Sequence, residues 1–205
     1  MSGPRILVLF HSTGGATWKM AQAVAQGAAA ARAAVTLKQV PEIAEAPAIQ
    51  GPDYAEKRAA FADVPVAEPA DLAACDGLAL GTPVHFGSMS AALRVFLDQT
   101  GKMWFDGALI GKPATVFAGA GSGGGRESAI LSLWALLGTH GMTIVPLGLR
   151  AAEVMDLSTV HGGSPLGAGT VTRGPGDRPS REELAMARVQ GAALAETAAA
   201  LARGG

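Results

Sequence analysis

Two loops of glycine and hydroxyl residues carry the side-chain types that bind a phosphate group. The first loop, Ser12-Thr13-Gly14-Gly15-Ala16-Thr17, lies between the apolar run Ile6–Phe10 and a helical pattern. Such a turn leaves backbone N–H groups free at the helix N-terminus, where they and the positive end of the helix dipole attract an anion. No Lys or Arg interrupts the loop before Lys19, so it predicts a neutral site for a phosphate monoester. An ordinary strand–helix turn with a hydroxyl cap is the alternative.

The second loop, Gly119-Ala120-Gly121-Ser122-Gly123-Gly124-Gly125, follows the apolar run Ala114–Ala118. Its glycines have the G-x-G-x-x-G spacing of the dinucleotide fingerprint. The acidic residue that binds the ribose in that fold stands about 20 residues further on, where this chain has Ile144-Val145-Pro146. The sequence therefore excludes a standard Rossmann NAD site. The stretch Gly107–Pro113 is not a P-loop either, because its spacing differs and it lacks the Ser/Thr that holds magnesium.

Histidine and cysteine spacing argues against metal and thiol chemistry. The four histidines lack HxxxH and HExxH spacings and Cys75 is the only cysteine, so we expect no metal site and no internal disulfide. His140 precedes Gly141 at the predicted end of a helix, where a partner of the helix dipole is more common than a catalyst. No Gly-x-Ser-x-Gly elbow precedes a helix, so a serine hydrolase is not indicated.

The strands and helices that position these loops alternate along the chain. Apolar and alternating runs predict strands over Ile6–Phe10, Val35–Val40, Gly77–Gly81, Ala114–Ala118 and Met142–Leu147. Helical spacing predicts helices over Thr17–Ala34, Ser90–Gln99, Arg126–His140 and from a Ser180–Glu183 capping box to Leu201. This order predicts an α/β fold with helices on both faces of a parallel sheet.

Ligands of such a sheet bind beyond the carboxyl ends of its strands. Three loops stand at these ends: residues 12–17, Thr82-Pro83-Val84-His85-Phe86-Gly87-Ser88-Met89 and residues 119–125. Because all three follow strands of the same parallel sheet, we expect them to converge on one binding site.

Three other segments break the alternation. Residues 41–70 hold five prolines, and we expect a flexible, irregular excursion with one short helix near Tyr54–Phe61. Gly101–Lys112 reads as a loop that carries Trp104 and Phe105, and residues 151–173 as a glycine-rich irregular segment.

Composition limits the class of protein. We expect the 205 residues to form a single domain, 1–205, because 49% are hydrophobic and the length is that of one sizeable core. A net charge of −1 gives no electrostatic case for nucleic acid or an anionic membrane. The apolar run at Ile6–Phe10 is too short for a signal peptide core or a membrane helix, so we expect a cytoplasmic protein without membrane insertion.

Several long motifs stand out along the chain: Gly81-Thr82-Pro83-Val84-His85-Phe86-Gly87-Ser88-Met89-Ser90, Phe96-Leu97-Asp98-Gln99-Thr100-Gly101, Gly121-Ser122-Gly123-Gly124-Gly125, His140-Gly141-Met142 and the pattern from Pro179 to Gly191. Together they resemble the WrbA-like NAD(P)H:quinone oxidoreductases, a branch of the flavodoxin-like superfamily. The resemblance covers nearly the whole chain. It implies a three-layer flavodoxin-like fold with a five-stranded sheet of order 2-1-3-4-5, noncovalent FMN, and ping-pong transfer of two electrons from NAD(P)H to quinones.

The resemblance also implies roles for individual residues. Residues 12–17 hold the FMN phosphate, and Thr82–Phe86 with Gly119–Gly124 flank the isoalloxazine and the ribityl chain. Trp104 and His140 line the flavin pocket from different subunits of a homotetramer. Gly14, Phe86 and Trp104 face the substrate, and His140 is the one candidate catalytic side chain, since the flavin itself carries the chemistry.

Two positions depart from the family pattern. Gly14 stands where the family usually has Tyr, and His85 stands where it usually has Arg. FMN binding survives both changes, whereas the use of NAD(P)H and the rate with quinones depend on them. A flavodoxin-type electron carrier is one alternative, although a carrier's acidic docking surface does not fit a charge of −1. A non-enzymatic FMN-binding protein is the other.

Overall fold

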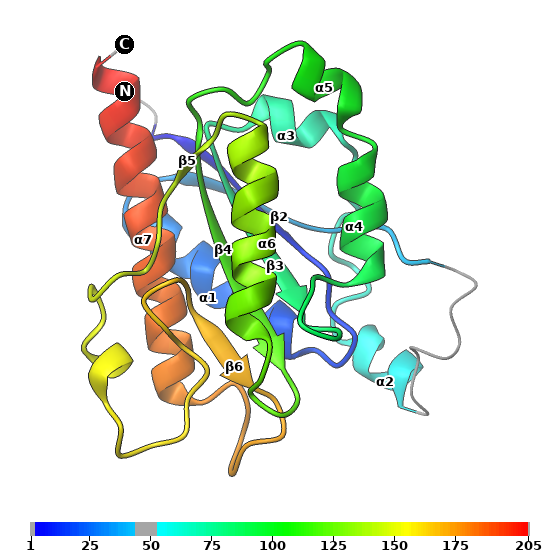
Figure 1. Cartoon of the computed structure of the whole chain (residues 1–205), viewed down its shortest axis with the longest axis vertical. Helices are drawn as coiled ribbons and strands as arrows, with labels where there is room; N and C mark the ends of the chain where they lie inside the picture. The colour runs from blue at the N-terminus through cyan, green and yellow to red at the C-terminus, as the bar shows by residue number, and fades with distance from the viewer. Residues whose placement is uncertain (1–2, 44–52, 205) are drawn as a thin grey trace.

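The computed structural model describes residues 3–43 and 53–204, and the chain is built around one parallel sheet (Figure 1). Across the sheet the strands follow the order β2 (Ala34–Gln39), β1 (Arg5–Phe10), β3 (Gly77–Pro83), β4 (Pro113–Ala120) and β5 (Thr143–Ile144). Every pairing between these neighbours is parallel. The structure confirms the 2-1-3-4-5 order and the α/β class.

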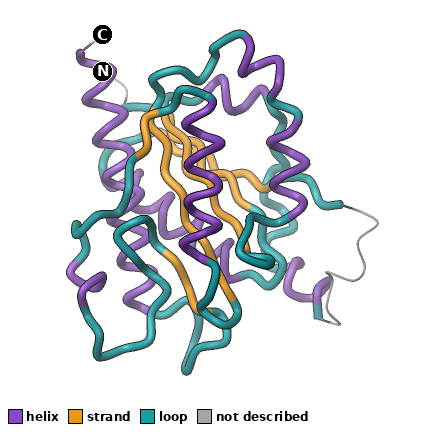
Figure 2. The backbone as a smooth tube through the Cα atoms, viewed as in Figure 1, coloured by secondary structure: helices purple, strands orange, loops and turns teal. Residues whose placement is uncertain are grey.

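Helices cover both faces of the sheet, which makes three layers (Figure 2). The helices α1 (Ala16–Ala30) and α7 (Arg181–Gly204) pack on one face, and α3 (Ala70–Ala74), α4 (Ala91–Asp98) and α6 (Arg126–Thr139) pack on the other. Along β1, Val8 belongs to the first hydrophobic cluster and Leu9 to the second. The strand is apolar throughout because both of its faces are buried.

Two short strands share the fifth position of the sheet. β5 pairs with Pro113–Ala114 at the start of β4, and β6 (Gly169–Val171) pairs with Ala118–Ala120 at its end. The predicted strand over Met142–Leu147 is therefore too long, because the chain leaves the ladder before Pro146, which has no N–H to donate. The sheet gains a sixth strand, and the segment 151–173 is not irregular throughout.

A buried glutamine closes the gap between β5 and β6. Gln190 of α7 is fully buried, and its amide nitrogen donates to the Val116 carbonyl at 2.8 Å and to the Thr115 hydroxyl. Its oxygen accepts from the Ala168 N–H at 2.6 Å. Gln190 therefore replaces the strand-to-strand hydrogen bonds that the middle of β4 lacks on this side.

A buried glutamate at the start of α7 fixes β6 in place. The predicted capping box is confirmed, since the Ser180 N–H donates to Glu183 at 2.8 Å and the Glu183 N–H donates to the Ser180 hydroxyl at 3.3 Å. The Glu183 carboxylate also accepts from Gly162 N, Val171 N and Thr170 Oγ1. It forms an ion pair with Arg178 at 3.0 Å.

The described part of the excursion at 41–70 packs against the core. The helix α2 (Tyr54–Ala59) confirms the short helix expected near Tyr54–Phe61. Phe61 is buried and meets the ring of Phe10 edge-on at 6.0 Å and that of Trp18 face-on at 5.5 Å. Aromatic packing of Phe61 therefore joins the described residues 53–70 to the core; residues 44–52 lie outside the described part.

Trp104 lies on a helix, which corrects the predicted loop. The helix α5 (Gly101–Phe105) follows α4 almost directly. The Trp104 indole N–H donates to the Thr139 carbonyl at 2.9 Å, and this bond ties α5 to the end of α6.

Candidate functional site

The loop at residues 12–17 presents free hydrogen-bond donors at the carboxyl end of β1. Within the described residues, no acceptor takes the backbone N–H groups of Thr13, Gly14, Ala16 or Thr17. The Ser12 hydroxyl accepts from Gly15 N at 3.1 Å, which keeps its own proton free to donate. No atom lies within 4 Å of the place a Cβ on Gly14 would occupy. The loop thus forms an open cradle of neutral donors at the N-terminus of α1.

The loop after β3 is a tight turn that projects an aromatic ring. His85 and Ser88 exchange two backbone hydrogen bonds of 3.0 Å, and the turn between them places Phe86 and Gly87 at positive φ, 51° and 77°. A positive φ is uncommon for a phenylalanine and marks a constrained backbone. The Phe86 side chain is fully exposed. Thr82 differs, because its buried hydroxyl donates to Pro83 O and accepts from Ser90 N, so it supports the turn from within.

The glycine loop after β4 touches both other loops. A Cβ on Gly125 would lie 2.9 Å from the Gly87 Cα, so the two backbones approach as closely as glycines allow. The Ser128 hydroxyl donates to the Gly87 carbonyl at 2.8 Å and joins the same two loops. On the other side, the place of a Cβ on Gly119 lies 3.5 Å from Thr17 Oγ1. The three predicted loops therefore converge, with Gly119 and Ala120 at the end of β4 and the remaining glycines in the turn.

A polar cluster beside the phosphate-type loop was not found from the sequence. His11 is buried directly before Ser12, and its Nε2 donates to Glu42 at 3.0 Å. Glu42 also pairs with Arg58, whose second terminal nitrogen donates to Gln39 at 2.9 Å. Burial raises the pKa of Glu42, but the hydrogen bond from His11 and the nearby charge of Arg58 outweigh this effect, so its pKa lies below the usual value. The residues are far apart in the sequence, and only the docked excursion brings them together.

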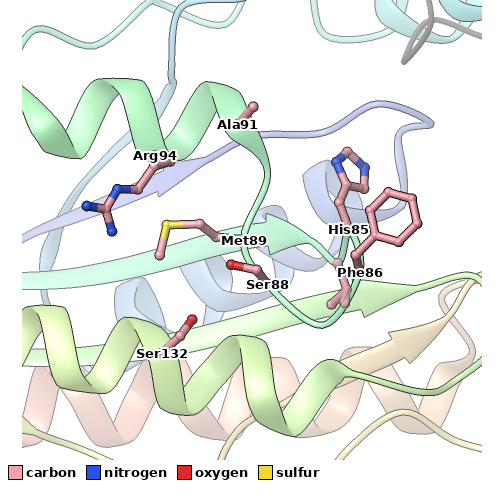
Figure 3. Close-up of a pocket in the computed structure, with 8 residues that line it drawn as sticks. His85, Phe86, Ser88, Met89, Ala91, Arg94 and Ser132 are labelled. Atoms are coloured by element: carbon pink, nitrogen blue, oxygen red, sulfur yellow. The ribbon is translucent and has the colours of Figure 1, made fainter.

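A pocket of about 700 Å³ opens beside the turn at 85–88, between α4 and α6 (Figure 3). In Figure 3, Arg94 of α4 and Ser132 of α6 point into this space, while His85 and Phe86 stand at the tip of the turn. Its lining is mainly apolar: Val84, His85, Phe86, Ser88, Met89, Ala91, Arg94 and Ser132. Burial, together with the charge of nearby His11, lowers the pKa of His85, so the imidazole is neutral at pH 7.

His140 and Trp104 lie at the opposite end of α6 from the glycine loop. The helix has 14 residues, which span about 21 Å at a rise of 1.5 Å per residue. There the two side chains line a second pocket of about 460 Å³, between α4, α5 and α6. Within one chain, the structure brings the three loops together but does not bring His140 and Trp104 to them.

A hydrogen bond and burial together favour the neutral form of His140 with its proton on Nε2. The Thr100 hydroxyl donates its proton to the Leu97 carbonyl at 2.6 Å, so the contact of 3.0 Å between Thr100 Oγ1 and His140 Nε2 has the imidazole as donor. Burial lowers the pKa of His140, which favours this neutral ring. Nδ1 is then an acceptor, and it is buried with no partner among the described residues.

Comparison with known proteins identifies the class to which this arrangement belongs. Residues 4–154 match the NADPH-dependent FMN reductases. The chain belongs to the NADPH-dependent FMN reductase family. This family membership indicates FMN as the cofactor and supports an FMN-dependent oxidoreductase or a flavodoxin-type protein.

Solved structures agree with this assignment. A WrbA-like flavodoxin from Agrobacterium tumefaciens is 25% identical, with a TM-score of 0.65 over 95% of this chain and 97% of that one. An oxidoreductase from Corynebacterium diphtheriae is 20% identical, with a TM-score of 0.60 over 96% and 97% of the two chains. Flavodoxin 1 from Bacillus cereus is 18% identical, with a TM-score of 0.59 over 94% and 97%. The last two show the fold alone.

The residues present fit FMN. The cradle at 12–17 offers neutral donors to a phosphate monoester, and the glycine loop lets a planar ring approach the backbone. Near that loop, the Arg126 guanidinium has buried nitrogens without a partner among the described residues. No group of three or more His, Cys, Asp or Glu side chains in the described ranges is arranged to hold a metal ion. No helix in those ranges is long and apolar enough to span a membrane.

Proposed function

We propose that this protein is a WrbA-like, FMN-dependent NAD(P)H:quinone oxidoreductase. The observation that carries the proposal is the apolar pocket of about 700 Å³ beside the turn at 85–88, which is large enough for a planar substrate ring next to the cofactor loops. An electron carrier needs an accessible flavin edge but no such pocket. Bound FMN supplies the redox chemistry, accepting two electrons from the nucleotide and passing them to the quinone in a ping-pong sequence.

The chain's own residues bind FMN and orient the substrate against it. Residues 12–17 hold the FMN phosphate through backbone N–H and hydroxyl donors, and residues 84–86 with 121–124 hold the ring. Phe86, which is exposed and fixed by its turn, offers an aromatic wall to nicotinamide or quinone. Gly14 leaves the facing side open, since nothing lies within 4 Å of its Cβ position. The neutral His85 gives no charge to the dinucleotide at pH 7.

We also propose that a homotetramer completes the site. Large apolar side chains are exposed on α4, α5 and α6, the helices that border the two pockets: Val95, Trp104, Phe105 and Leu131. Such a surface favours burial against another copy of the chain. Because Trp104 and His140 lie about 21 Å along α6 from the glycine loop, only a neighbouring copy can bring them to an FMN on that loop. Light scattering tests this; a monomer mass at micromolar concentration contradicts it.

Cellular location follows from the same reading. The free, buried Cys75 fits a reducing compartment, and we propose that the protein works in the cytoplasm with NAD(P)H and quinone as its partners.

One experiment separates the quinone reductase from its two alternatives. We expect the purified protein to show a flavin spectrum, to release FMN on denaturation, and to oxidise NADH or NADPH rapidly only when benzoquinone is present. A flavodoxin-type carrier would bind FMN but would not oxidise the nucleotide with quinone. A non-enzymatic binder would neither oxidise the nucleotide nor exchange electrons with a redox partner. Release of FAD in place of FMN would contradict the cofactor assignment.

A further inference from the structure

Arg126 lies at the edge of the glycine loop, near the charges of Glu183 and Glu127, with hydrogen-bond donors that no described residue uses. Its Nε and Nη1 atoms are buried and have no hydrogen-bond partner among the described residues. Nη1 lies 3.2 Å from the place that a Cβ on Gly123 would occupy, so the guanidinium rests directly against the loop. Burial lowers the pKa of Arg126, although not enough to discharge a guanidinium at neutral pH.

The nearest buried acid is already committed elsewhere. Glu183 lies close enough to influence Arg126, yet its two oxygens accept from five donors, one of them Arg178. That pair satisfies both Arg178 and Glu183, so Arg126 is left with unused donors in a part-buried position. A buried charge without a partner is costly, and a protein keeps one where a bound group supplies the missing acceptor.

We propose that Arg126 is the residue that faces the FMN ring system and stabilises the negative charge that FMN gains on reduction. The inference rests on the FMN-dependent function proposed above and deepens it. The ring carries carbonyl and nitrogen acceptors that match the free N–H groups of a guanidinium. A positive charge fixed at this place strengthens its interaction when the ring becomes more negative, and it therefore tunes the potential of the cofactor. Arg126 acts as a positioning and electrostatic residue and takes no part in proton transfer.

The test compares how variants bind oxidised and reduced FMN. Arg126→Gln and Arg126→Met remove the charge and keep similar length, whereas Arg126→Lys keeps the charge. Arg181→Gln removes a charge from the exposed first turn of α7 and is the matched control. Fluorescence quenching gives the Kd for oxidised FMN, and anaerobic equilibration with a reference dye gives the midpoint potential of bound FMN.

We expect both neutral variants to weaken the binding of reduced FMN at least tenfold more than the binding of oxidised FMN. This difference lowers the two-electron midpoint potential by about 30 mV. The midpoint potential of Arg126→Lys should fall by less than half as much as that of the neutral variants. The midpoint potential of Arg181→Gln should match that of the wild type. Equal weakening of both redox states, or an unchanged potential in the neutral variants, would overturn the proposal, because the residue would then only shape the loop. The neutral variants differ in polarity, so one of them suffices if the other does not fold.

The outcome also separates this inference from the proposed function. A wild-type chain that binds no FMN overturns both. A chain that binds FMN and shows the Arg126 effect, yet does not reduce quinone with NAD(P)H, overturns the quinone reductase alone.

Discussion

Glu183→Gln tests whether one buried carboxylate holds β6 and the neighbouring site together. The side chain is fully buried, and five donors meet its two oxygens at distances from 2.7 to 3.0 Å. Glutamine has nearly the same shape but only one oxygen. The NH2 group of the glutamine must face either Ser180 N or the donors that meet the other oxygen. Either way, two hydrogen-bond donors are brought together without an acceptor. Arg178, whose side chain is 7% exposed, also loses its counter-ion.

The size of the effect follows from these contacts. Removing one partner of a buried ion pair costs about 3–5 kcal/mol, because the remaining charge stays buried and uncompensated. We therefore expect the free energy of unfolding to fall by about 4 kcal/mol, a large part of the 5–15 kcal/mol typical of a native domain. With a urea slope of about 2 kcal/mol per M, the midpoint falls by about 2 M.

Urea unfolding of FMN-free protein, followed by circular dichroism, measures this directly, because bound FMN would add its own stabilisation. Glu196→Gln is the matched control: it removes the same charge from an exposed position of the same helix, and we expect a change within about 0.5 kcal/mol. Equal midpoints for Glu183→Gln and Glu196→Gln would refute the reasoning. Since Glu183 binds Thr170 and Val171 of β6, beside the glycine loop, we also expect weaker FMN binding in Glu183→Gln only.

Other predictions concern the cofactor loops. Ser12→Ala and Thr17→Val should each weaken FMN binding by about 1–2 kcal/mol in a fluorescence titration, because each removes a hydrogen bond to a charged group. Unchanged affinity in both variants would show that the loop is not part of the FMN site. Gly14→Tyr meets open space and should lower the KM for small quinones several-fold without changing FMN affinity; unchanged kinetics would show that Gly14 does not face the substrate. Because the pKa of His85 is lowered, its charge and any gain in NADPH affinity should appear only below about pH 6.5. His85→Gln should abolish that acid-side gain, and a gain that persists in this variant would assign it elsewhere.

The main strands and the converging loops could be predicted because each depends on local sequence, whereas the order of the strands in the sheet followed only from the family resemblance. The strands at Ile6–Phe10 and Ala114–Ala118 are continuous apolar runs, and an apolar run of that length has few other uses in a soluble chain. The Ser180–Glu183 capping box is equally local, since both partners lie within one helical turn. The structure adds that the same Glu183 carboxylate serves partners more than ten residues away, which spacing does not reveal.

The features that sequence reasoning missed depend on contacts between distant segments. β6 is only three residues long, and its pairing depends on a 24-residue return of the chain after β5 that no local pattern encodes. The His11–Glu42 bond requires the excursion to dock, and Phe61 reads as an isolated aromatic residue until it packs on Phe10 and Trp18. From the sequence, Arg126 is only the first residue of a predicted helix. That its guanidinium lacks hydrogen-bond partners depends on the residues packed around it in the fold.

The distribution of charge around the site separates binding the cofactor from tuning it. A phosphate on residues 12–17 has the same charge in both redox states, so donors there stabilise oxidised and reduced FMN equally and set affinity alone. The loop has no cation, and neutral donors suffice for that task. A cation near the ring stabilises the reduced state more than the oxidised one, and it therefore changes the potential. Arg126 lies at the end of a different loop from the phosphate cradle, and its Nε and Nη1 atoms have no hydrogen-bond partner among the described residues. Variants of the two loops should therefore behave differently. Ser12→Ala should raise the Kd for oxidised and reduced FMN equally and leave the potential unchanged. Arg126→Gln should raise the Kd for reduced FMN more than the Kd for oxidised FMN.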